Sequence, residues 1–161
     1  MKRRWLIYIV VGVLFGIFDF YYPTIFLHFT FDPHYGGQII GFAFTFGVWL
    51  VPVIPIVLYE AQVSRSKLFP ALASSLTWCI SIIFYYVTNV FQLAKGSSYQ
   101  PWMRISNYRA PGFLSNWENE LSVDLTNTLE WVVFASIAGF IIGFLVSLIY
   151  LFFFRNKRDL Q

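Results

Sequence analysis

The residue of this chain that most readily suggests chemistry is one aspartate, Asp19, in the apolar run GVLFGIFDFYYP at residues 12–23. A carboxylate at membrane depth is costly unless it faces protein, water or a partner, so it marks a candidate site. Pro23 has no N–H to donate to the carbonyl of Asp19, four residues earlier. The sequence therefore predicts a carboxylate beside a freed carbonyl, a pattern that suits a cation or proton site and is equally typical of a fraying helix end.

Other polar residues fall at the same predicted depth as Asp19. At 1.5 Å per residue Asp19 lies roughly 21 Å beyond Trp5, in the outer third of a membrane. Two hypotheses stay open: a structural anchor that pairs with Lys95, Arg104 or Arg109, and a coupling carboxylate for transport. The candidate polar or ion site consists of Asp19, Tyr22, Gln38, Tyr85, Thr88, Asn89, Gln92 and Glu130.

Other kinds of chemistry have little support in the sequence. His28 and His34 with Asp32 could bind a metal ion, but their spacing matches no motif, so we predict no metal and no cofactor. The single cysteine, Cys79, has no partner for a disulfide and reads as a small buried residue. Because no nucleophile motif and no phosphate-binding loop is present, we lean against an enzyme.

The elements that would position these residues are four long apolar runs. The chain has 161 residues, of which 58% are hydrophobic and 12% charged, which is unlike a soluble domain. A helix needs about 20 residues to cross a bilayer. We predict one all-α domain, residues 1–161, with four transmembrane helices at about 5–22, 39–59, 68–93 and 129–154. Pro23 should end or kink the first, and Pro52 and Pro55 should kink the second.

The positive charges predict the topology of this bundle. They cluster before the first run, between the second and third, and after the fourth, which places both termini in the cytoplasm. Glu60 reads as part of a charged helix end with Arg65 and Lys67. The bilayer explains the net charge of +3 better than nucleic acid does, and we expect a multi-pass protein of the plasma membrane. The clustered basic residues are Lys2, Arg3, Arg4, Arg65, Lys67, Arg155, Lys157 and Arg158.

The outer segment, residues 94–128, is the only stretch expected to form structure outside the membrane. Ser115 and Glu118 have the spacing of a capping box that opens a helix. One side of that helix would be apolar, opposite its acids, and consist of Leu114, Trp117, Leu121 and Leu125. We therefore predict a short amphipathic helix on the membrane surface, between the third and fourth membrane helices.

Small residues mark two helix-packing faces. They recur every four residues on the last predicted helix and twice on the first, which lets helix backbones approach closely. These faces and the lack of catalytic motifs favour an accessory subunit that packs on itself or on a larger membrane complex. The alternative is a small proton- or cation-coupled transporter with Asp19 as its coupling carboxylate. The two faces are Ala135, Gly139, Gly143 and Ser147, and Gly12 and Gly16.

Overall fold

The computed structural model describes residues 2–30, 47–96 and 100–155, and these form helices without any strand. The long elements are α1 (Lys2–Thr30), α3 (Leu50–Ser64), α4 (Leu68–Lys95) and α5 (Phe113–Arg155). Two short 3₁₀ turns, η1 (Pro101–Met103) and η2 (Ile105–Asn107), lie between α4 and α5. Helices satisfy every backbone polar group internally, which is what a chain this apolar needs in a bilayer.

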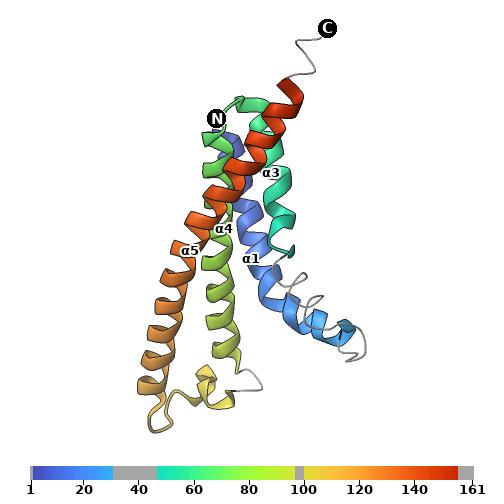
Figure 1. Cartoon of the computed structure of the whole chain (residues 1–161). Helices are drawn as coiled ribbons and strands as arrows, with labels where there is room; N and C mark the ends of the chain where they lie inside the picture. Colours follow the sequence, from blue (N-terminus) through green and yellow to red (C-terminus); the bar gives the residue numbers. More distant parts are fainter. Residues whose placement is uncertain (1, 31–46, 97–99, 156–161) are drawn as a thin grey trace.

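Three of these helices are long and apolar enough to cross a membrane: α1, α4 and α5. The chain is therefore an all-helical membrane protein. The fourth apolar helix, α3, has only 15 residues, or about 22 Å of helix. The predicted second crossing, residues 39–59, lies partly outside the described residues. The start of α1, the turn between α3 and α4 and the end of α5 lie at one end of the bundle (Figure 1), which we call the terminal end.

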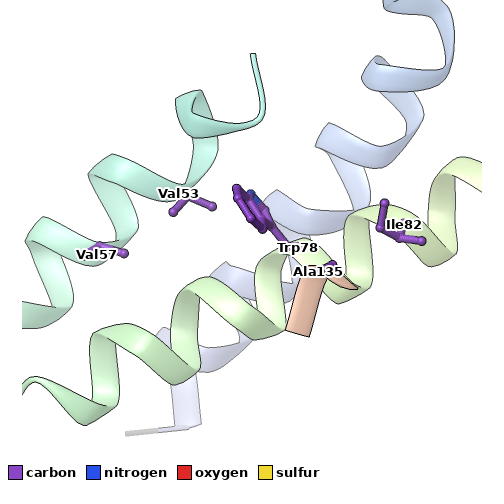
Figure 2. Close-up of a cluster of buried hydrophobic side chains, with 5 residues drawn as sticks. All are labelled: Val53, Val57, Trp78, Ile82 and Ala135. Atoms are coloured by element: carbon purple, nitrogen blue, oxygen red, sulfur yellow. The ribbon is translucent and has the colours of Figure 1, made fainter. Parts of the chain in front are cut away.

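Helix α4 is the centre of the bundle, and each of the other long helices packs against it (Figure 1). A core of buried side chains joins α3, α4 and α5 where these three helices meet. Figure 2 shows Trp78 of α4 extending toward Val53 of α3, with Ala135 of α5 close by. Val53 and Ala135 are fully buried. The apolar side chains on the outside of the helices then face lipid.

The predicted packing face of the first helix is in contact with α4. A Cβ atom added at Gly12 would lie 2.8 Å from the carbonyl oxygen of Thr77 and 2.9 Å from Cβ of Ile80. One added at Gly16 would collide with the carbonyl oxygen of Ser81. Only glycine allows the backbones of α1 and α4 to approach this closely.

The predicted packing face of the last helix also contacts α4, on residues nearer its start. A Cβ atom at Gly139 would lie 2.9 Å from Cα of Ser75, and one at Gly143 would lie 2.8 Å from Cα of Ala71. Ala135 and Ser147 of the same face are fully buried. Both small-residue faces are therefore used inside the chain, to hold α1 and α5 against one central helix.

Of the two effects predicted for Pro23, ending or kinking the first helix, the structure shows a bend, and α1 passes the predicted end at about residue 22. It continues to Thr30 with Pro23 inside it, and its last part turns away from α4 (Figure 1). A proline inside a helix removes one hydrogen bond, here the one to the Asp19 carbonyl, but it fixes a backbone angle that helices tolerate. The helix therefore bends in preference to stopping.

Where the second predicted helix, at about 39–59, begins lies outside the described residues. Gly47 is helical, a turn follows at Val48 and Trp49, and α3 begins at Leu50. Pro52 cannot donate to the carbonyl of Val48, and that carbonyl accepts the N–H of Val51 at 3.1 Å. At the other end the helix passes Tyr59 and continues to Ser64, so Glu60 is a helical residue.

The short amphipathic helix and the last membrane helix are one element, which corrects our prediction of two. Helix α5 runs for 43 residues without a break, because its sequence contains no proline and its two glycines are packed against α4. It begins at Phe113, after Gly112 at φ 77°, and Ser115 donates to the Gly112 carbonyl at 2.9 Å. Ser115 therefore lies within the helix and is not its N-terminal cap.

Candidate functional site

Asp19 is buried in the structure, with 8% of its surface exposed. Its carboxylate accepts a hydrogen bond from the side chain of Trp49, which precedes α3. None of the lysine or arginine side chains that the structure describes forms an ion pair with Asp19. Two of the cations expected to pair with it bond elsewhere: Arg104 donates to the carbonyl of Lys95 at 3.1 Å, and Arg109 lies over the ring of Tyr108.

Trp49 connects Asp19 to the rest of the bundle. Its carbonyl accepts the indole N–H of Trp78 at 2.9 Å, and its ring lies edge-on to that of Trp78 with centroids 5.8 Å apart. The ring of Trp131 on α5 lies 6.3 Å away on the same measure. Buried indole N–H groups need an acceptor, and those of both Trp49 and Trp78 have one. Through Trp49, Asp19 is therefore connected to a cluster of aromatic side chains that also contains Trp78 of α4 and Trp131 of α5.

Two tyrosines of α4 lie near acidic residues of the neighbouring helices. Tyr85 lies near Asp19 of α1 and Asp124 of α5, and its ring packs against Phe20 of α1 at a centroid distance of 5.4 Å. Tyr86 lies near Asp124 and Glu130 of α5. Helix α4 therefore has tyrosine side chains close to acidic residues on both α1 and α5.

Asn89 of the predicted site is hydrogen-bonded to Asp124 of α5. The amide of Asn89 donates to the two carboxylate oxygens of Asp124 at 3.1 and 2.9 Å. Asp124 is 8% exposed, as buried as Asp19. Sequence reasoning missed Asp124 because it fell in a segment expected outside the membrane. The contact joins α4 to α5 farther from the terminal end than the small-residue face of α5.

The remaining predicted site residues make separate contacts. The Gln92 amide donates to the hydroxyl of Tyr21 on α1, and Thr88 donates to the carbonyl of Phe84 in its own helix at 2.7 Å. The ring of Tyr22 packs on Phe18. Glu130 is exposed, and Gln38 lies outside the described residues. The candidates thus form a polar layer across α1, α4 and α5, not one pocket.

A second buried carboxylate, Glu60, lies at the terminal end of the bundle and is only 1% exposed. Arg4 donates to its two carboxylate oxygens at 3.1 and 3.2 Å, and the hydroxyl of Tyr8 donates to Oε2 at 2.5 Å. This corrects the expectation that Glu60 belongs to a solvated helix end with Arg65 and Lys67. Arg4 and Tyr8 are four residues apart and so share one face of α1, the one sequence signal that points to this site.

Within the described part of the chain, the geometry offers no set of ligands for a metal ion. No group of three or more His, Cys, Asp or Glu side chains comes together among the residues described. His28, His34 and Asp32, the predicted candidates, lie outside the residues whose side chains are described. What the polar layer can do is exchange a proton or hold a cation at Asp19, which faces an indole and aromatic rings.

Comparison of the chain with protein-family models, with curated proteins and with solved structures finds no match.

Proposed function

We propose that the protein is a small accessory subunit that associates, through the outer part of α5, with a second copy or with a larger membrane complex. The observation that supports this is a stripe of exposed leucines. Leu114 is 78% exposed, Leu125 61% and Leu129 60%, and Leu121 lies on the same face. Spacings of seven and four residues keep all four on one side of the helix.

The length of α5 makes this stripe unusual. Its 43 residues correspond to roughly 64 Å of helix, whereas the hydrocarbon core is about 30 Å thick. If the end of α5 lies at one membrane surface, its first turns extend beyond the other. Apolar side chains outside the bilayer are unfavourable in water and mark an interaction surface. The two small-residue faces are already used within the chain and do not contribute to this proposal.

Replacing Leu121 and Leu125 together with glutamate tests this association. We expect the protein to move from a larger species to its monomer in native electrophoresis of mild-detergent membrane extracts, because two charges on the stripe oppose burial of the surface. The matched control places the same charges on the neighbouring exposed positions Ser122 and Thr126 and should leave the larger species intact. If the unaltered protein migrates as a monomer in native membranes, the proposal is wrong.

A second candidate function is a proton- or cation-coupled transporter, with Asp19 as the coupling carboxylate. It is favoured by the burial of Asp19 without an ion pair among the described residues. A buried carboxylate whose described donor is a neutral indole gains much from a proton or a cation. The aromatic rings around Trp49 are compatible with a cation as the ligand.

Proton flux in proteoliposomes tests this second function. With a pH-sensitive dye inside and a potassium diffusion potential across the membrane, we expect acidification that Asp19→Asn abolishes, because asparagine cannot carry the proton. Glu118→Gln removes a carboxylate at an exposed position of α5 and should leave the flux unchanged. Flux that is absent in the unaltered protein, or that survives Asp19→Asn, would rule out proton coupling through Asp19.

A further inference from the structure

Helix α3 is connected to α1 by a carboxylate contact at each of its ends. Just before its start, Trp49 donates to Asp19 of α1. Near its last turn, Glu60 accepts from Arg4 and Tyr8 of α1. In the described ranges these are the polar side-chain contacts that join the two segments. Between them α3 packs chiefly on α4 and α5, and only sparsely on α1.

Each end of α3 is also a break in the regular backbone. Before Leu50 the chain turns at Val48 and Trp49, where Pro52 removes a helical hydrogen bond. After Ser64 the chain leaves the helix through Arg65, which has a left-handed backbone at φ 51°. A short rigid helix between two such breaks can shift as a unit, since a few residues at its ends absorb the change in backbone angles.

The contact at the terminal end is built so that it can open. Glu60 and Tyr8 are almost fully buried, at 1% and 2% exposed, while the side chain of Arg4 is 22% exposed. One side of the ion pair is therefore accessible from outside the protein, so that water can reach the charges when they separate. Tyr8 also packs with Ile56 of α3 and Ala73 of α4. The same tyrosine therefore takes part in both the polar contact and the apolar packing next to it.

We propose that Arg4, Tyr8 and Glu60 form a releasable gate between α1 and α3 at the terminal end of the bundle. When the gate is closed it keeps water out of the interface between these helices. When it opens, α3 moves away from α1 and water enters that interface toward Asp19. The inference goes beyond both proposed functions and needs neither of them, because it concerns only how the helices separate.

Thiol accessibility tests the gate without any knowledge of a substrate. Ala73 is fully buried beneath the gate, and Ala73→Cys in a Cys79→Ser background provides one reporter thiol. The probe is a charged methanethiosulfonate reagent that does not cross membranes, applied in turn to each face of sealed vesicles. We expect slow labelling with the gate intact, only from the face that carries the termini.

Variants of the gate should change this labelling rate in a defined order. Arg4→Gln and Glu60→Gln should each raise the rate on the order of tenfold, because the rate follows the population of the open form. Tyr8→Phe should raise it less, since the ion pair remains. The double variant Arg4→Glu with Glu60→Arg restores an ion pair and should bring the rate back toward the starting value. Arg3→Gln removes a charge at the adjacent exposed position and should have no effect.

Three outcomes would overturn the gate. The first is a reporter that is never labelled in the protein with an intact gate, which would make the contact a permanent structural tie. The second is an unchanged rate in both single variants. The third is a charge-swapped protein that elutes as a folded monodisperse species and labels as fast as the single variants. Because the swap and Tyr8→Phe keep the site filled, the test holds even where one single variant fails to fold.

Discussion

Two buried carboxylates in this protein are stabilised in different ways. Glu60 has a guanidinium and a hydroxyl as donors, whereas Asp19 has the neutral indole of Trp49 as its donor among the described residues. A buried charge without an opposite charge is costly, while a well hydrogen-bonded pair recovers much of that cost. Glu60 is therefore stabilised by an ion pair while the helices stay together, whereas Asp19 is suited to bind a proton or a cation.

At this scale the sequence identified one of the two residues. Asp19 is conspicuous because it interrupts an apolar run, and no knowledge of its neighbours is needed to single it out. Glu60 reads from the sequence as part of a charged helix end, because the predicted helix stops at about Tyr59 and the boundary of a helix is its hardest feature to predict. Its partner Arg4 lies 56 positions away, and only the folded structure brings the two together.

Among the elements, α4 organises the bundle, because the small-residue faces of both α1 and α5 pack against it. The glycines of α1 contact residues such as Thr77 and Ser81, and those of α5 contact Ala71 and Ser75. Without a hydrophobic force between helices in lipid, such close backbone contacts supply much of the packing energy. The association of α1 and α5 with α4 should therefore be sensitive to a single added methyl group.

Alanine substitution of these glycines tests that sensitivity. Gly12→Ala and Gly143→Ala should each destabilise the protein by about 1–3 kcal/mol, the usual cost of overpacking, and lower its thermal unfolding temperature in detergent. Gly47 has no atom within 4 Å of an added Cβ, so Gly47→Ala is the matched control and should leave the unfolding temperature nearly unchanged. Equal unfolding temperatures for Gly143→Ala and Gly47→Ala would contradict the packing described for α5.

The lengths of the helices were predicted less well than their existence. The spacing of small residues revealed the two packing faces, but their common partner, α4, could not be read from them, since a stripe shows only that something packs there. The apparent start of a new helix at Ser115 came from a local capping pattern. The sequence between Phe113 and Arg155 contains no proline, which was the stronger signal because it is compatible with one continuous helix.

For the molecule as a whole, the basic residues and the arrangement of the helices agree on which ends lie together. The start of α1, the α3–α4 turn and the end of α5 share one end of the bundle (Figure 1), and the basic clusters fall in or next to these three segments. The sequence could predict this grouping because positive residues accumulate on one side of a membrane. It could not show that α3, the described helix within this run, has only 15 residues, because the apolar run predicted at 39–59 begins earlier and is longer.

Reporter fusions test which side of the membrane this end occupies. We expect a fluorescent protein fused after Ser66 or after Gln161 to fluoresce, because it folds in the cytoplasm. Alkaline phosphatase fused after Tyr108 should be active, because that position lies between α4 and α5 at the other end. Active phosphatase after Ser66 would place the basic clusters outside and contradict the charge rule.

The central place of α4 also has a consequence for how the protein is made. Synthesis releases α1 and α3 before α4, so Gly12 and Gly16 enter the membrane while their packing surface is still unmade. During that interval the Glu60 pair with Arg4 is a contact that α1 and α3 can form on their own. It can hold them together beside the translocation machinery until α4 emerges. The ion pair would then first stabilise an assembly intermediate. A nascent chain without it would present α1 and α3 to the quality-control machinery as two helices that do not associate.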